Sequence, residues 1–230
     1  MRGEGGEGRT RTLVCFAVKE EAAPFLKFAT HDGGISVLVT GMGKLNSDRM
    51  IRERLAQTAP DLVLTCGFAG ALNPELKIGD VLFEEDAGSG LGELLRASGA
   101  SAAKFYCSSR VATTAAEKTA LRQSTGADVV EMESGVIRKI CREKQIPSAT
   151  IRVVSDAAHQ DLPLDFNALM TAEQTISFSR LALALIKSPG KVPQLMELQR
   201  NTRHAAQELA GVLEKLLSRR NRGGGSARLG

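Results

Sequence analysis

Residues 126–137, with the sequence GADVVEMESGVI, decide the fold that we predict for this chain. A short apolar run ends in two carboxylates, Glu131 and Glu133, and leads directly into a helical pattern. Asp and Glu are poor strand residues, and open α/β sheets build their ligand sites at the carboxyl ends of strands. The two carboxylates therefore indicate either a functional strand end or simply the start of a helix, where the dipole favours negative charge.

The same alternation of apolar runs and helical patterns continues along the whole chain. Continuous apolar runs are typical of strands buried on both faces, and strands alternating with helices indicate a largely parallel sheet. We predict one α/β domain with a mixed, mostly parallel central sheet flanked by helices on both faces. Besides the run within 126–133, strands are expected at 12–18, 35–40, 61–66, 81–84, 104–112 and 148–155, and helices at 22–28, 45–57, 115–123, 134–144, 165–186 and 192–218.

The two ends and one internal segment differ in composition from this pattern. We expect residues 1–11 to be disordered, residues 12–218 to form the domain, and residues 219–230 to be a flexible basic, glycine-rich tail. Residues 85–101, rich in Gly, Ala and Ser, are interpreted as a mobile or poorly specified connection. In the helix at 115–123, Glu117 and Lys118 are expected on the outside.

Composition excludes several classes of protein. Of the 230 residues, 43% are hydrophobic, which is too many for a disordered chain. Aromatic residues make up only 4%, without tryptophan, which argues against a stacking platform for single-stranded nucleic acid. The net charge of +4 is modest and much of it lies at the ends, so we expect no nucleic-acid partner.

The cysteines and histidines indicate neither disulfides nor a metal site. The four cysteines form no CxxC pair and are interpreted as small buried side chains in a reducing compartment, and the three histidines are scattered (Cys15, Cys66, Cys107, Cys141; His31, His159, His204). No apolar run is long enough for a membrane span, and the charged start does not resemble a signal peptide. We expect a soluble, cytoplasmic protein without cofactor, metal or stable membrane insertion.

Acidic residues follow three separate strands. Glu21, Glu133 and Asp156 each come just after a predicted strand end, and parallel strands bring such ends to one edge. The sequence has no Ser-His-Asp pattern, metal cluster or P-loop. Carboxylates alone suit cleavage at an acetal-like carbon, where an oxocarbenium ion is stabilised and a leaving group is protonated. The same logic applies to the N-glycosidic bond of a nucleoside.

Six short motifs follow one another along the chain: VKEE (18–21), TGMGK (40–44), CGFAGAL (66–72), IGD (78–80), VEME (130–133) and RVVSD (152–156). Taken in this order, they resemble the nucleoside phosphorylase/nucleosidase superfamily over roughly residues 12–186. The similarity is closest to the methylthioadenosine/S-adenosylhomocysteine nucleosidase branch.

The resemblance implies a role for each matching position. Asp156 corresponds to the acid at purine N7, oriented by Ser155, and Glu21 to the glutamate that activates the attacking water. Glu133 corresponds to the carboxylate that binds the ribose hydroxyls. The remaining substrate-binding positions implied are Met132 beneath the sugar, the small residues Ala69 and Gly70, and Gly43 in the Gly-x-Gly turn. The resemblance also implies a homodimer or larger oligomer.

Several features leave the reaction and the substrate open. The short, glycine-rich segment after Asp80 leaves the 5′ group undefined, and Phe68 would narrow the base pocket. Residues 113–134 and 188–193 also resemble a hopanoid-associated branch, which removes adenine from an adenosyl-lipid. Hydrolysis of a 5′-modified adenosine is favoured over phosphorolysis, because a carboxylate near C1′ repels phosphate. A non-catalytic nucleoside-binding module is the alternative of another class.

Overall fold

The computed structural model describes residues 11–86, 89–171 and 178–223. Within these residues, one mixed sheet of eight strands runs through the molecule in the order β2-β1-β3-β8-β4-β5, with β7 beside the end of β3 and β6 beside β7. The predicted fold class is confirmed. The strands are β1 (Thr12–Phe16), β2 (Ile35–Val39), β3 (Leu62–Ala71), β4 (Val81–Glu85), β5 (Ser101–Ala102), β6 (Phe105–Cys107), β7 (Val129–Glu131) and β8 (Ser148–Asp156).

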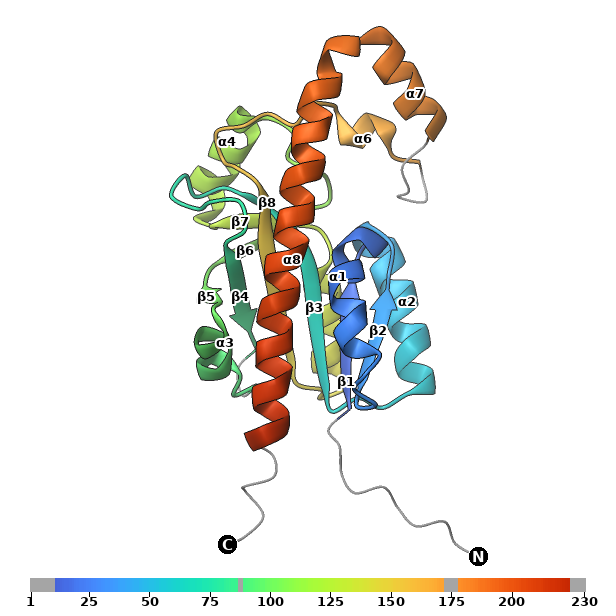
Figure 1. Cartoon of the computed structure of the whole chain (residues 1–230), viewed down its shortest axis with the longest axis vertical. Coiled ribbons are helices and arrows are strands. Elements are labelled where there is room, and N and C mark those ends of the chain that lie inside the picture. The colour runs from blue at the N-terminus through green and yellow to red at the C-terminus, as the bar shows by residue number, and fades with distance from the viewer. Residues whose placement is uncertain (1–10, 87–88, 172–177, 224–230) are drawn as a thin grey trace, which may run out of the picture.

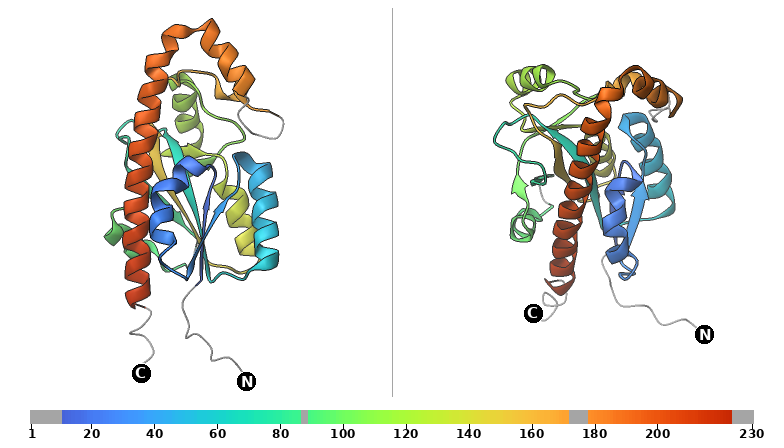
Figure 2. Two further views of the ribbon diagram at one scale, coloured as in Figure 1. Left: turned by 45° about the vertical axis from the view of Figure 1, so that its right-hand side comes forward. Right: turned by 45° about the horizontal axis from the view of Figure 1, so that its top comes forward.

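Helices cover both faces of the sheet, as Figures 1 and 2 show. On one face α1, α3 and the long α8 pack together, and on the other face α2 packs on α5. Above the sheet lie α4, α6 and α7. The helices are α1 (Lys19–Ala29), α2 (Gly43–Gln57), α3 (Gly92–Ser98), α4 (Ala115–Thr125), α5 (Ser134–Glu143), α6 (Phe166–Leu169), α7 (Phe178–Lys187) and α8 (Val192–Gly223).

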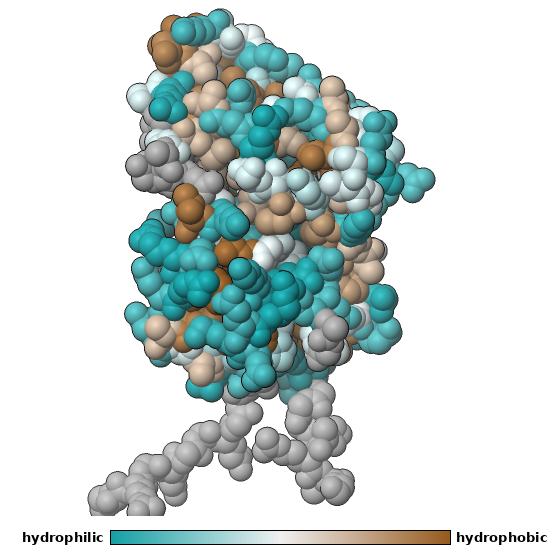
Figure 3. All heavy atoms as spheres, turned by 180° about the vertical axis from the view of Figure 1, so that it is seen from behind, coloured by the Kyte–Doolittle hydropathy of each residue, from teal (hydrophilic) through white to brown (hydrophobic). Residues whose placement is uncertain are grey.

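The central strands are buried on both faces, as their apolar runs predict. In β1, Val14 and Phe16 join the core beneath α1 and α8, whereas Leu13 and Cys15 join the core beneath α2 and α5. Successive strand residues point to opposite faces, so a run without polar residues can fill two cores at once. The face seen in Figure 3 is mostly hydrophilic, with separate small hydrophobic patches.

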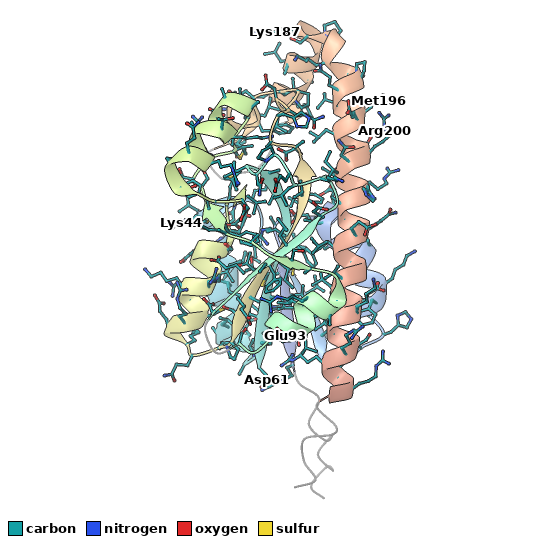
Figure 4. The ribbon with its side chains drawn as sticks, turned by 90° about the vertical axis from the view of Figure 1, so that its left-hand side faces the viewer. Lys44, Asp61, Glu93, Lys187, Met196 and Arg200 are labelled. Atoms are coloured by element: carbon teal, nitrogen blue, oxygen red, sulfur yellow. The ribbon has the colours of Figure 1, made fainter. Side chains whose placement is uncertain are left out.

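The strand directions bring several carboxyl ends to one edge of the sheet. β1 is parallel to β2 and β3, and β3 is parallel to β8, whereas β4 and β7 run antiparallel to β8 and β3. The carboxyl ends of β1, β3 and β8 therefore meet at one edge. In Figure 4, Asp61 marks the opposite edge, just before β3, and Lys187 of α7 marks the side where these strands end.

Three predicted elements were wrong in extent. β3 continues through residues 67–71 instead of ending at 66, and these residues pair with β8 and β7. The expected strand at 104–112 is only β6, and residues 108–112 leave the sheet. The expected single helix at 165–186 is interrupted, since Asp165 caps the short α6 and Met170 is extended.

The predicted connections and ends also need correction. Residues 92–98 form α3, and Leu95 is fully buried, so the segment at 85–101 is not a poorly specified connection where it is described. Helix α8 extends to residue 223, so residues 219–223 are helical. Residues 1–10 and 224–230 lie outside the described residues. Cys107 is exposed, unlike the other three cysteines, which are buried.

Candidate active site

Glu21, Glu133 and Asp156 come together on the wall of one cavity of about 200 Å³. Glu21 lies in the first turn of α1 after β1, Glu133 is the residue just before α5 after β7, and Asp156 ends β8. The convergence predicted from the strand ends is therefore present. The other lining residues are Ala17, Val18, Met42, Phe68, Ala69, Gly70, Arg110, Val111, Ala112, Val130, Glu131, Met132, Ser155 and Leu162.

The carboxylate of Glu21 is held by backbone N–H groups. Its Oε2 accepts hydrogen bonds from Ala17 N at 2.8 Å and Val18 N at 3.1 Å, and its Oε1 accepts from Phe68 N at 2.8 Å. Burial raises the pKa of Glu21 above its usual value, although these donors and the Arg152 guanidinium act to lower it. The neighbouring Glu20 is exposed, so the geometry selects Glu21 rather than Glu20 for the cavity.

Glycine at position 67 makes the approach of Glu21 possible. A Cβ on Gly67 would lie 2.7 Å from Oε1 and 2.9 Å from Oε2 of Glu21. Such distances are shorter than van der Waals contact, so any other residue would push the carboxylate away from β3. The small-residue stretch of the strand therefore positions a functional side chain from another element.

Glu131 faces inward and is fully occupied by protein partners. Its carboxylate accepts from the backbone N–H groups of Glu133 and Ser134, from Ser134 Oγ at 2.6 Å and from Arg152 Nη2 at 2.7 Å. Burial acts to raise the pKa of Glu131, but the Arg152 guanidinium and the other donors outweigh it and hold this pKa below its usual value. Glu131 therefore anchors the turn into α5 and neutralises a buried arginine.

Glu133 is bound less completely than Glu131. Its Oε1 accepts from Gly43 N at 2.8 Å, and its Oε2 lies 3.8 Å from Arg152 Nη2. Burial, together with the nearby negative charge of Glu131, raises the pKa of Glu133 to about 7, and Arg152 only partly opposes this. One oxygen of this carboxylate thus remains available to accept hydrogen bonds from a ligand in the cavity.

Asp156 sits at the other end of the same cavity. Ser155 Oγ donates to its Oδ1 at 2.8 Å and also approaches the carbonyl of Ala69 at 3.4 Å. A Cβ on Gly70 would lie 3.1 Å from Oδ2 of Asp156, so glycine gives this carboxylate its room. Ser155 and Gly70 therefore fix the position of the Asp156 side chain.

Lys118 was predicted on the outside of its helix, and this is wrong. Its side chain is fully buried, and its Nζ lies 2.6 Å from Oδ2 of Asp156. The sequence carries a partial signal for this, since Thr114 and Glu117 form a capping box that fixes the helix start. Lys118 then lies one turn before Leu121, on the face that packs toward the core.

The remaining predicted residues divide into two groups. Met132, Ala69 and Gly70 line the cavity themselves, and Met132 lies between Glu131, which ends β7, and Glu133, which precedes α5. Gly43 is not among the lining residues and acts through its hydrogen bond to Glu133. Residues that the sequence did not single out also line the cavity: Arg110, which pairs with Glu117, and Val111, whose backbone exchanges two hydrogen bonds with the Asn167 side chain.

A second cavity of about 420 Å³ adjoins the first and shares Asp156 and Leu162 with it. It lies between residues 156–163 and the start of α8. The first cavity alone is smaller than the roughly 300–1,000 Å³ usual for small-molecule sites. A ligand that extends past Asp156 would therefore use both cavities.

The described part of the chain carries neither a metal-binding cluster nor a membrane-spanning helix. No group of three His, Cys, Asp or Glu side chains there is placed to hold a metal ion. Nor does any helix within the described ranges combine the length and apolar character that crossing a membrane requires.

Comparison with known proteins connects this geometry to a family. The family model described as the phosphorylase superfamily matches residues 14–90 and 93–187. An aminodeoxyfutalosine nucleosidase of Campylobacter jejuni is 24% identical over 191 residues, covering 66% of this chain and 80% of its own length. A 5′-methylthioadenosine/S-adenosylhomocysteine nucleosidase of Shewanella halifaxensis is 26% identical over 170 residues, covering 58% of this chain and 74% of its own.

Solved structures show the same fold. The futalosine hydrolase of Helicobacter pylori superposes with a TM-score of 0.68 at 16% identity, covering 91% of this chain and 98% of its own. A 5′-methylthioadenosine/S-adenosylhomocysteine nucleosidase of the same organism, bound to butyl-thio-DADMe-Immucillin-A, also gives 0.68 at 17% identity, covering 93% of this chain and all of its own. The family match, the shared fold and the converging carboxylates agree: the chain belongs to the phosphorylase superfamily, and its curated relatives are nucleosidases.

Proposed function

We propose that this protein hydrolyses the N-glycosidic bond of a 5′-modified adenosine and releases adenine. The observation that carries the proposal is the convergence of Glu21, Glu133 and Asp156 on one cavity, with Met132 beside them. These are the groups needed to bind a sugar, activate water and assist a leaving base. The names of the curated relatives support the same chemistry.

Each residue has a part in this proposal. The free oxygen of Glu133 accepts hydrogen bonds from the ribose hydroxyls, and Met132 packs beneath the sugar. Glu21 holds the attacking water near C1′ and takes up its proton. Asp156, oriented by Ser155, assists the base at N7, while Ala69 and Gly70 form the adjacent wall.

The charges around the cavity favour water over phosphate as the nucleophile. Glu21 and Glu133 are both carboxylates, and a phosphate dianion beside them would be repelled. Arg110 is the sole cationic residue among the described lining residues, and it pairs with Glu117. Phosphorolysis remains the alternative to be tested directly.

The nature of the 5′ group stays a prediction. None of the described residues between 81 and 109 lines the cavity, so the segment after Asp80 contributes no wall to it. A bulky 5′ group therefore meets little protein from that segment. We also propose a homodimer or larger assembly, which sedimentation equilibrium would test by giving a mass of at least twice 24.5 kDa.

A substrate panel tests the function. The protein is incubated with methylthioadenosine, S-adenosylhomocysteine, aminodeoxyfutalosine, adenosine and inosine, with and without phosphate, and free base is measured by chromatography. We expect adenine from at least one 5′-modified adenosine, at a rate that phosphate does not change. Release that requires phosphate would establish phosphorolysis. Binding without release would indicate a nucleoside-binding module, and no response to any of these would point to an adenosyl-lipid substrate.

A further inference from the structure

Lys118 is a buried cation whose hydrogen-bonding capacity is fully used. Its Nζ lies 2.6 Å from Oδ2 of Asp156 and donates to the carbonyls of Ala157 at 2.8 Å and Gln160 at 2.9 Å. A lysine ammonium has three N–H donors and no acceptor. Three acceptors around one fully buried nitrogen therefore fit the charged ammonium and leave no donor unsatisfied.

The partner of Lys118 is the carboxylate at the base end of the cavity. Oδ2 of Asp156 faces Lys118, and Oδ1 accepts from Ser155 Oγ. A carboxylate that accepts at both oxygens carries no proton of its own. Yet the proposed reaction requires Asp156 to give a proton to the departing purine. The nearest source of that proton is the ammonium 2.6 Å away.

We propose that Lys118 is a positioning residue that holds Asp156 in place and supplies, through it, the proton that the departing base takes up. This inference rests on the proposed function. As the bond between N9 and C1′ breaks, its electron pair goes to the purine. Lys118 passes a proton to Oδ2 of Asp156, and Asp156 passes one to N7.

The rest of the step balances with one water molecule. Water adds its oxygen to C1′ and gives a proton to Glu21, which returns it to solvent. After the base leaves, the neutral amine of Lys118 regains a proton from solvent through Asp156, which also lines the 420 Å³ cavity. One nucleoside and one water thus give one neutral purine and one free sugar.

The first test compares Lys118→Met with a matched control. Lys139 is an exposed helix lysine, so Lys139→Met should match the wild type. Lys118→Met should lower kcat for the adenosine substrate by about 10²–10³, the size of a general-acid effect, with KM within about threefold. The 7-methyl analogue carries its positive charge at N7 already, so its kcat should change little. Equal losses for both substrates would reduce Lys118 to a structural role, and no loss would remove it from the reaction.

A second test addresses the possibility that Lys118→Met folds poorly because Asp156 is left without its partner. The double variant Lys118→Met/Asp156→Asn removes both charges. If Lys118 acts through Asp156, the double variant should be no slower than Asp156→Asn alone, since the two residues act as a unit. Losses that multiply would overturn the inference, and circular dichroism confirms that each variant is folded.

A third measurement needs no turnover, so it separates failure of this inference from failure of the proposed function. With aspartate labelled at the carboxyl carbon, the Asp156 resonance is identified by its loss in Asp156→Asn. At pH 7 the resonance should move in Lys118→Met, because the ammonium 2.6 Å from Oδ2 is gone, and should stay at its wild-type position in Lys139→Met. Coincident resonances in Lys118→Met and the wild type would overturn the pairing. An enzyme inactive on every nucleoside, with this change present, would overturn the proposed function and leave the pairing of Lys118 with Asp156 standing.

Discussion

The buried charged groups differ between the two ends of the cavity. At the Arg152 end, one guanidinium faces the three carboxylates of Glu21, Glu131 and Glu133. At the Lys118 end, one ammonium faces the single carboxylate of Asp156. The first end therefore carries surplus negative charge, and the second is a balanced ion pair.

This difference matches the separation of charge when an N-glycosidic bond breaks. The sugar becomes positive and the base becomes negative as the bond lengthens. Burial raises the pKa of Glu21 and Glu133, because it destabilises their ionised forms. Positive charge that develops on the sugar beside them stabilises these ionised forms. Fixed charges aimed at a developing charge are a major source of catalysis. The cavity is therefore polarised along the bond that we propose it cleaves.

The largest effect is expected from breaking the ion pair within the Arg152 end. Glu131→Gln leaves the buried Arg152 without its main partner, which should cost about 3–5 kcal/mol of unfolding free energy at pH 7. Glu133→Gln is the matched control two residues along. Burial raises the pKa of Glu133 to about 7, above the pKa of glutamate in the unfolded chain. The free energy of unfolding therefore falls as the pH rises from that unfolded-state pKa to 7, because Glu133 ionises more readily in the unfolded chain. Its variant should therefore be as stable as the wild type at pH 5 and more stable at pH 8.

Urea denaturation at pH 5 and pH 8 measures both variants. Equal destabilisation by the two substitutions at pH 8 would contradict the distinction between an anchored carboxylate and a ligand-binding one.

The next effect tests the proposed role of Glu21 in activating water. Glu21→Gln should reduce kcat by about 10²–10³, since a general base contributes that much. Glu20→Gln alters the exposed neighbour and should leave kcat unchanged. Steady-state adenine release measures both variants. Similar rates for Glu21→Gln and the wild type would remove Glu21 from the reaction.

A smaller effect tests whether Gly67 in β3 allows Glu21 to take its position. In Gly67→Ala the new methyl group would overlap the Glu21 carboxylate, at 2.7 Å from its Oε1. A displacement of this kind should lower kcat by about tenfold, because small misplacements of catalytic groups are costly. Gly190→Ala, where a Cβ meets nothing within 4 Å, is the control. If Gly67→Ala keeps full activity, the cavity does not depend on this contact.

The smallest effect is a pH dependence. Burial raises the pKa of Glu133 to about 7, and only the ionised form accepts hydrogen bonds from two ribose hydroxyls. As pH falls from 7 to 6, kcat/KM of the wild type should drop by about fivefold. The Glu133→Gln variant should not show this decrease. A wild-type profile that is flat down to pH 5 would show that Glu133 stays ionised in the free enzyme.

Much of the fold was predictable because buried strands have a strong local pattern. The apolar runs of β1 and β8 and the carboxylates after them placed Glu21 and Asp156 correctly at one edge. The sequence predicts that the third strand ends at residue 66, but it continues through residues 67–71. Their pairing with β8 and β7 depends on partners about 60 to 85 residues away, which local sequence does not encode.

Lys118 shows most clearly where sequence reasoning fails. A lysine in a short helix is usually solvated, and its burial here depends on Asp156 and on two carbonyls 39 and 42 residues further along. The strand predicted at residues 108–112 was wrong for a related reason. Part of this segment lines the cavity wall, where the backbone of Val111 pairs with the side chain of Asn167, 56 residues further along.

We propose that this polarised cavity cleaves an N-glycosidic bond with water. The most direct measurement is a single turnover of methylthioadenosine in ¹⁸O-labelled water that also contains phosphate, followed by mass spectrometry of the sugar. The account predicts free adenine and a sugar carrying one ¹⁸O at C1. A sugar 1-phosphate without the label would contradict it.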